Sequence, residues 1–235
     1  MKNKFLQINS MQYLHYLLSR KIVDFSIQDS ITVSLDRALK KSAMVNLQQQ
    51  EGNGKTTGLA TYIIGRPNCY YIKIGPSYGM KNIFSEMIFL MSGEPIGSYI
   101  SIWEMVKRLA EILTKNRNEK KLVCIDDCTH LSFRQLSYFQ ELRDLTIENT
   151  AFVFISPPIF QDRLKKAIGK VAGVGEFYRR VQGFVKLPGL TRGDIVKYCD
   201  EKKVTKDEMA LVGDIKTIAS LETEVDKIID AREFK

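Results

Sequence analysis

A short glycine-rich run is the part of this 235-residue chain whose residue types most clearly serve chemistry. It reads EGNGKTT over residues 51–57, and its candidate ligand-binding residues are Gly52, Asn53, Gly54, Lys55, Thr56 and Thr57. Glycines let backbone N–H groups curl around a phosphate, and a helix that starts here adds partial positive charge. The lysine reaches nucleotide β- and γ-phosphates, and the first threonine hydroxyl is a ligand for Mg²⁺. Lying between the apolar runs AMVNL and LATYII, the segment predicts a phosphate-binding loop for ATP and Mg²⁺.

The beginning of this loop departs from the full pattern. GxxxxGK[ST] starts with a glycine, and this chain has Gln49 at that position. A residue with a side chain accepts fewer backbone conformations than glycine does. We therefore expect a less permissive start to the loop, although the GxGKT half is intact.

Two adjacent carboxylates follow a second apolar run, LVCI, at residues 122–125. Asp126 is placed to hold Mg²⁺, directly or through water, together with Thr56. Asp127 stands where a glutamate usually polarises the attacking water. The alternative is a strand that ends in an ordinary polar turn. Beside a phosphate-binding loop, the pair favours nucleotide hydrolysis.

Four further polar residues are candidates for sensing the nucleotide. Ser156 ends the strand-like run FVFIS, where it could touch the γ-phosphate or the attacking water, or simply end a strand. Arg179 and Arg180 precede the last predicted strand, and one of them could reach a neighbouring subunit's nucleotide; the alternative is a pair of surface arginines at a helix end. Lys216 could act as a basic sensor on a helix, or could be an exposed lysine.

The elements that must position these residues alternate between strands and helices. The predicted strands are short and rich in β-branched and aromatic residues: Ala43–Leu47, Cys69–Ile74, Leu122–Ile125, Phe152–Ile155 and Phe184–Leu187. Helices are predicted over 5–19, 31–40, 79–92, 101–116, 133–148, 191–202, 205–211 and 214–230, and after Lys55. Capping boxes support three of them: Ser101 with Glu104, Ser132 with Gln135, and Thr205 with Glu208. The alternation predicts a parallel α/β sheet with helices on both faces.

Domain organisation and composition bound the function. We expect a helical extension over 1–30, an α/β core over 31–188 and a small helical subdomain over 189–235. The net charge of +8 favours a polyanionic partner, above all nucleic acid. The four cysteines form no CxxC pair, and with two histidines they give no zinc-ligand spacing, so we expect reduced thiols. No apolar run is long enough for a membrane span, and we expect a cytoplasmic protein.

The order of GNGKTT, IDD, FVFIS, FYRR and LPGLTRGDI resembles that of the AAA+ ATPases, with Walker A and Walker B motifs in the first two places. More narrowly, the chain resembles the transposition regulators of the Mu B, TnsC and TniB/ExeA group. Three segments carry this narrower likeness: IKIGPSYGMKNIFSEMIFLMSGEP, IDDCTHLSFRQLSYFQELRDL and RRVQGFVKLPGLTRGDIVKYC. The resemblance covers residues 31–230 and departs from the group at Gln49 and Asp127. Because 54 residues precede Lys55, it implies a minimal version without the N-terminal DNA-binding domain of the Mu B protein.

The resemblance implies a three-layer P-loop fold with a five-stranded parallel sheet and a small C-terminal helical lid. It implies a slow ATPase, stimulated by DNA or a partner, that forms head-to-tail rings or filaments on duplex DNA with little sequence preference. Such proteins recruit and stimulate a transposase and so regulate DNA integration. The implied DNA contacts are Lys73, Lys81, Lys107 and Arg108, whereas the run KNRNEKK at 115–121 favours a solvated loop.

Two other functions remain open from the sequence. The chain could load a replicative helicase, or act as another DNA-associated switch, with the same nucleotide site. It could also be a nucleotide-binding scaffold without activity, if Asp127 cannot activate water.

Overall fold

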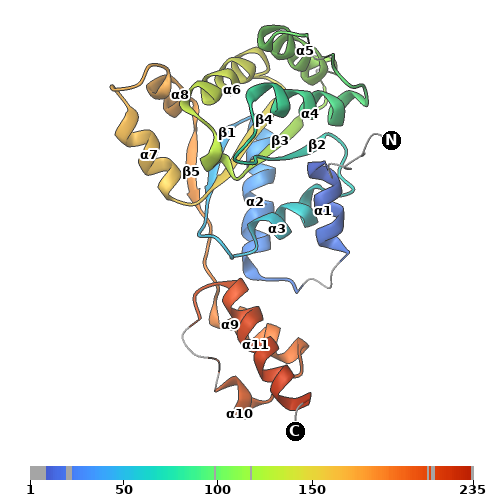
Figure 1. The fold of residues 1–235 in the computed structure, drawn as a ribbon, viewed down its shortest axis with the longest axis vertical. Coiled ribbons are helices and arrows are strands. Elements are labelled where there is room, and N and C mark those ends of the chain that lie inside the picture. The colour runs from blue at the N-terminus through green and yellow to red at the C-terminus, as the bar shows by residue number, and fades with distance from the viewer. Residues whose placement is uncertain are drawn as a thin grey trace.

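A parallel sheet forms the centre of the larger part of the molecule (Figure 1). The computed structural model describes residues 9–19, 23–97, 99–116, 118–210, 212 and 215–233. The strands are β1 (Met44–Gln48), β2 (Cys69–Lys73), β3 (Lys121–Asp126), β4 (Thr150–Ser156) and β5 (Gly183–Lys186). They lie in the order β2-β3-β4-β1-β5, and all are parallel. The predicted α/β fold with a five-stranded parallel sheet is therefore confirmed.

Helices cover both faces of the sheet, because successive strand residues point to opposite sides. Val123, Ile125 and Phe154 face one core, which packs against helices α4 (Met80–Ser92), α5 (Ile102–Thr114), α6 (Phe133–Leu145), α7 (Ile159–Ala167) and α8 (Val174–Arg180). Leu122 and Val153 face the other core, which packs against α1 (Ser10–Leu18), α2 (Ser26–Lys41) and α3 (Lys55–Ile63). Strands β3 and β4 are buried along their whole length, which explains their continuous apolar runs.

Some helix boundaries differ from the prediction. α2 begins at Ser26 instead of residue 31, because its buried stripe already starts at Ile27 and continues through Ile31 and Leu35. The helix therefore crosses the domain boundary predicted at residue 30, which remains a prediction. α7 and α8 were not predicted, although Phe160, Leu164 and Ala167 recur at helical spacing in α7; two prolines precede α7, and α8 is only 7 residues long.

The segment after β5 contains only helices among its described residues. They are α9 (Arg192–Glu201), α10 (Lys206–Met209) and α11 (Ile218–Glu233), and Figure 1 shows them together at the C-terminal end of the molecule. We refer to these three helices as the lid. The three predicted capping boxes are confirmed at α5, α6 and α10. The helix predicted over 214–230 begins at Ile218, and residues 211, 213 and 214 lie outside the described residues.

All four cysteines are free and buried. Within the described ranges, no helix is both long and apolar enough to cross a membrane.

A buried carboxylate joins the lid to the core. Asp194, in the first turn of α9, accepts hydrogen bonds from the backbone N and Oγ of Ser26, both at 2.7 Å, where α2 begins. It also accepts from the N and Oγ1 of Thr191, at 2.9 and 2.6 Å. Burial acts to raise the pKa of Asp194, but the hydrogen bonds from Thr191 and Ser26 outweigh it, and the pKa lies below its ordinary value. One carboxylate thus caps two helices from different parts of the chain.

We expect Asp194→Asn to lower the free energy of unfolding by about 1–3 kcal/mol at neutral pH, because charge-assisted hydrogen bonds are lost at two helix starts. The contribution of a carboxylate with a depressed pKa is present above its unfolded pKa of about 3.9 and is lost as the pH falls through its folded pKa. Urea unfolding of parent and variant should therefore differ at pH 7 and converge below about pH 4. Asp200→Asn, on an exposed position of the same helix, is the control. Equal stability of parent and Asp194→Asn at pH 7 would rule out this joint.

Candidate nucleotide-binding site

The glycine-rich loop lies at the carboxyl edge of the sheet, between β1 and α3. Gly52 and Gly54 have φ angles of +76° and +70°, in the left-handed region that favours glycine. Gly54 immediately precedes α3, and within the described residues no side-chain hydrogen bond caps this helix start. The first-turn amides of α3 are therefore available to an anion, as a phosphate-binding loop requires.

The lysine of the loop folds back onto the loop itself. Lys55 Nζ donates to the carbonyl oxygens of Gln49 at 3.0 Å and Gln50 at 2.8 Å. Burial lowers the pKa of Lys55, and the carboxylates of Asp126 and Asp127 oppose this effect. The ammonium group is thus held beside the acidic pair by two weak carbonyl partners, which a phosphate can replace.

The glutamine at the start of the loop ties the loop to the lid. Gln49 Nε2 donates to the carbonyl of Leu187 at 3.1 Å and to that of Pro188. Its backbone N donates to Ser156 O at 3.1 Å. A glycine here could not make the side-chain contacts, so the departure from the pattern connects the loop to the segment that leads into α9.

The first acidic residue fits a magnesium site. Asp126 is 1% exposed, and its Oδ2 accepts from Thr56 Oγ1 at 2.8 Å and Tyr71 OH at 2.9 Å. Its Oδ1 accepts from the backbone N of Asp127 at 2.9 Å. Burial and the neighbouring Asp127 charge raise the pKa of Asp126, and the three hydrogen bonds lower it less. Hydroxyl and carboxylate oxygens are the hard donors that Mg²⁺ prefers, so this pair suits the ion.

Tyr71 is a site residue that sequence reasoning missed. It is fully buried on β2 and stands among apolar neighbours, so its hydroxyl needs a polar partner inside the protein. The only signal in the sequence is this tyrosine in a buried strand, and that signal does not identify Asp126 as the partner.

The second acidic residue faces a lysine. Asp127 has a left-handed backbone (φ 55°) at the start of a short 3₁₀ helix, η1 (Cys128–His130). Its Oδ2 lies 3.6 Å from Lys73 Nζ, and this ammonium lies 4.5 Å from the centre of the Tyr13 ring on α1. Lys73, predicted as a DNA contact, therefore lies in the nucleotide site. Its charge holds the carboxylate that the sequence assigned to water activation.

Ser156 lies at the end of β4, next to the loop and beside Gln48 in the sheet register. It is 1% exposed, and its Oγ accepts from Asn46 Nδ2 at 3.0 Å. The structure thus brings Ser156 to the predicted edge of the sheet, with its hydroxyl already engaged by a buried amide.

The first turn of α11 contacts the loop. Ala219 N donates to Gly52 O at 2.9 Å, and a methyl group added at Gly52 would lie 3.2 Å from Ala219 Cβ. Lys216 precedes the helix and is exposed, so the expectation that a helix presents it is wrong. Ile218, which would lie 3.1 Å from a methyl group at Gly54, occupies the position over the loop instead.

A pocket of about 430 Å³ opens beside the loop, within the range of about 300–1,000 Å³ typical of small-molecule sites. Its walls come from the segment before α2, the start of α3 and the lid, and include Phe25, Gly54, Thr57, Tyr198 and Ile218. The rings of Phe25 and Tyr198 stack at 5.8 Å. Burial, with smaller effects from nearby carboxylates, raises the pKa of Tyr198 to about 12, so the ring stays neutral. The pocket suits a planar base whose phosphates extend into the loop.

The structure separates the two arginines that the sequence could not. Arg180 Nε donates to both oxygens of Asp144, at 2.9 and 2.8 Å, and its Nη2 lies 2.7 Å from Oδ2. The hydrogen bond from Arg180 has the largest effect on the pKa of Asp144, and it holds that pKa below its usual range. The Arg179 side chain is 75% exposed and lies 3.7 Å from Glu176, one turn earlier on the same helix. Arg180 is therefore fixed to its own subunit, and Arg179 projects into solvent.

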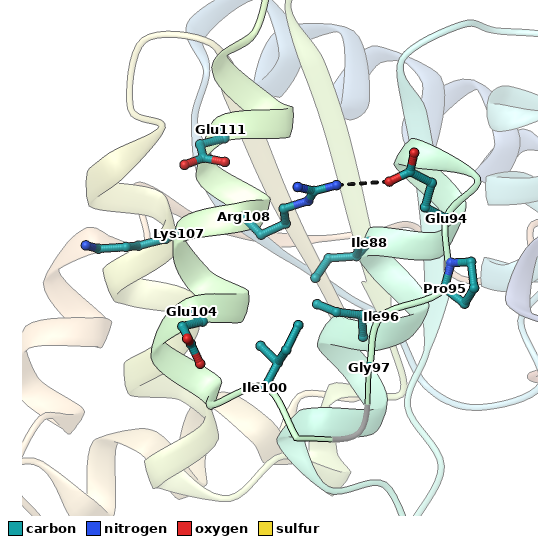
Figure 2. Close-up of a pocket in the computed structure, with 10 residues that line it drawn as sticks. All are labelled: Ile88, Glu94, Pro95, Ile96, Gly97, Ile100, Glu104, Lys107, Arg108 and Glu111. Carbon is teal, nitrogen blue, oxygen red and sulfur yellow. Dashed lines mark hydrogen bonds and ion pairs between the residues drawn. The ribbon is translucent and has the colours of Figure 1, made fainter.

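The remaining predicted DNA contacts lie on α4 and α5. Figure 2 shows Arg108 turned toward Glu94, with Nη2 to Oε2 at 3.0 Å, and Lys107 pointing away from the pocket between the two helices. Lys107 Nζ lies 3.6 Å from the centre of the Trp103 ring, on the outer side of α5. Lys81 is exposed in the first turn of α4. Lys107 and Arg108 line the pocket drawn in Figure 2, whereas Lys81 lies on the other helix and is not among its lining residues.

Comparison with solved structures identifies the class of this fold. The chain is similar to the Cdc6p protein of Pyrobaculum aerophilum, at 18% identity and a TM-score of 0.56, over 78% of this chain and 51% of that one. It is also similar to the replication initiator DnaA bound to AMPPCP and single-stranded DNA, at 16% identity and a TM-score of 0.54, over 90% of this chain and 63% of that one. The chain therefore shares its fold, a parallel sheet with helices on both faces, with these two proteins.

The chain spans between half and two thirds of the length of these two proteins. No protein-family model matches its sequence, and no curated protein matches it.

Proposed function

We propose that this protein is an ATP-dependent, DNA-binding AAA+ switch that regulates DNA transposition. The observation that carries the nucleotide part is the convergence of Lys55, the Thr56–Asp126 pair and Asp127 at one edge of the sheet. The similar DnaA structure holds AMPPCP and single-stranded DNA, which supports nucleotide and DNA binding here.

Each part of the site then has a role in ATP hydrolysis. The loop amides and Lys55 hold the phosphates, and the mutually stacked rings of Phe25 and Tyr198 form the pocket wall beside the base. Thr56 and Asp126 would hold Mg²⁺, which would neutralise charge on the phosphates. Asp127 accepts the proton of the attacking water, and Ser156 lies where it can contact that water or the γ-phosphate. Lys216 is close enough in sequence to the loop-contacting turn of α11 to remain a proposed nucleotide contact.

A neighbouring subunit completes the site. Arg179 projects from α8 and is free to reach a nucleotide bound by the next subunit, where it would stabilise charge on the γ-phosphate. Such a contact is heterologous, so repetition of it gives a ring or a helical filament. We therefore propose head-to-tail assembly through the face that carries α8.

The transposition role rests on the order of motifs and on the three segments that resemble the Mu B group. Under this proposal the protein assembles on duplex DNA and recruits a transposase. A replicative helicase loader is the second candidate, because the similar DnaA protein is a replication initiator. Electron microscopy with duplex DNA and a slowly hydrolysed ATP analogue separates the two. Continuous filaments support the first candidate, and discrete complexes that form only with a helicase support the second.

Lys55→Ala is expected to weaken ATP binding by about ten- to a hundredfold and to abolish ATP-dependent assembly, because charge-assisted bonds to phosphate are lost. Binding of a fluorescent ATP analogue measures the first effect, and light scattering with DNA measures the second. Lys166→Ala, on an exposed position of α7, is the control. Unchanged ATP affinity together with unchanged DNA binding in Lys55→Ala would contradict the proposed site.

DNA binding is expected to be nearly independent of sequence and strongly dependent on salt. Each phosphate contact that is lost should lower the slope of log K against log salt by about 0.9. We propose Lys81 and Lys107 as the main contacts, because both are exposed, whereas Lys73 and Arg108 face carboxylates. Titrations of Lys81→Ala and Lys107→Ala at several salt concentrations test this, with Lys206→Ala in the lid as the control. A flat salt response of the parent protein would contradict assembly on the DNA backbone.

A further inference from the structure

A row of hydrogen-bonded polar side chains runs through the apolar core between the carboxyl end of β4 and α8. Asn46 and Gln48 on β1 are 0% and 1% exposed. They lie on the same face of the strand as Met44, which packs in the core beneath α4 to α8. Central parallel strands are normally apolar on both faces. Two amides here therefore require an explanation beyond packing.

The two amides are linked to each other and to the residues at both ends of this row of polar side chains. Asn46 Nδ2 donates to Ser156 Oγ at 3.0 Å, and Gln48 Nε2 donates to Asn46 Oδ1 at 3.0 Å. Gln48 Nε2 also donates to Gln161 Oε1 on α7 at 3.2 Å, and Gln161 Nε2 donates to Tyr178 OH on α8 at 3.2 Å. This row of polar side chains thus connects the nucleotide edge of the sheet to Tyr178, which precedes Arg179.

One atom in this row of polar side chains lacks a hydrogen-bond partner. Within the described part of the protein, Gln48 Oε1 is buried and has no hydrogen-bond partner. A buried acceptor without a hydrogen-bond partner is unfavourable, because it has lost its bonds to water and gained none in the protein. Gln48 Nε2 carries the hydrogen bonds to both Asn46 and Gln161, so a shift of either partner changes the bond to the other.

We propose that Gln48 and Gln161 are positioning residues that couple the state of Ser156 to the orientation of α8 and hence of Arg179. When Ser156 engages a γ-phosphate or its attacking water, the hydrogen bonding available to Asn46 changes. This change passes through Gln48 and Gln161 to Tyr178, whose ring stacks on Phe184 of β5 with centroids 4.9 Å apart. The subunit that binds ATP thereby adjusts the arginine that it offers to its neighbour. This inference rests on the proposed function, because it requires Arg179 to act on a neighbouring subunit.

The test compares turnover of separated and assembled subunits of the full chain. ATP hydrolysis is measured at rising protein concentration, with and without duplex DNA, for the parent, Tyr178→Phe and Gln161→Met. Tyr178→Phe removes only the hydroxyl and keeps the stacked ring. Tyr138→Phe, on a partly buried tyrosine of α6 against the same core, is the matched control. Tyr178→Phe and Gln161→Met, the two relay variants, should keep the parent's KM and its turnover at low concentration. The rise in turnover on assembly should be about tenfold smaller than in the parent. Tyr138→Phe should keep that rise.

The outcomes separate the relay from the proposed function. If the parent protein shows no rise with concentration or DNA, the proposed trans-acting site fails, and the relay fails with it. If the parent rises and both relay variants rise equally, the relay is overturned while the proposed function stands. A proportional fall of turnover at all concentrations in both variants also overturns the relay, because that result indicates a purely structural role.

Discussion

Asp127→Asn is expected to lower the rate of ATP hydrolysis by about 10²–10⁴-fold while sparing ATP binding and assembly. Asparagine keeps the shape of the side chain but cannot accept the proton of the attacking water. The loss of the ion pair with Lys73 should cost little stability, because both side chains are about 40% exposed. Assembly requires only the bound nucleotide, so it should persist in this variant.

The parent protein itself is expected to hydrolyse ATP slowly. A general base must come within about 2.6–3.2 Å of the water, and aspartate is one methylene shorter than the usual glutamate. The structure adds a second reason, because the Asp127 carboxylate is turned toward Lys73. Slow turnover leaves the ATP state long enough for filaments to accumulate.

Phosphate release on DNA, binding of an ATP analogue and electron microscopy together check this prediction. Asp162→Asn, which removes an exposed carboxylate on α7, is the control. If Asp127→Asn hydrolyses ATP at the parent rate on DNA, Asp127 is not the base, and the acidic pair serves Mg²⁺ alone.

Arg179→Ala is expected to lower turnover of the assembled protein by about 10³-fold, the lower range for a trans-acting arginine, and to leave separated subunits unchanged. Arg180→Ala should instead lower stability, because it breaks the bidentate pair with Asp144. The two variants therefore separate a role at the neighbouring nucleotide from a role within the subunit.

A mixing experiment gives the sharpest measurement. Asp127→Asn subunits assemble and carry Arg179 but lack a working site, and Arg179→Ala subunits have the opposite defect. Mixing the two should restore part of the assembled turnover, because a site of one kind meets the arginine of the other. If Arg180→Ala loses the assembly-dependent rise and Arg179→Ala keeps it, the assignment of the two arginines is reversed.

Much of the site could be predicted because its chemistry is written in short segments. The loop residues from Gly52 to Thr57 are consecutive, and so are Asp126 and Asp127. The apolar runs before them predicted the strands, and parallel strands bring their carboxyl ends to one edge. Ser156 followed from the same rule. Helices α7 and α8 were missed because two prolines precede α7 and because α8 is short.

What the sequence determined by itself was therefore the strand–helix alternation, the loop and the acidic pair, since each depends on residues within about one element of one another. The tertiary structure alone decided which side chains meet across elements. Strand order sets Tyr71 against Asp126 and Lys73 against Asp127. Docking of the lid places Phe25 against Tyr198, and the packing of α8 on α6 fixes Arg180 to Asp144 and leaves Arg179 exposed. Contacts of this kind join residues far apart in the chain, and no local pattern of hydrophobicity or spacing specifies them.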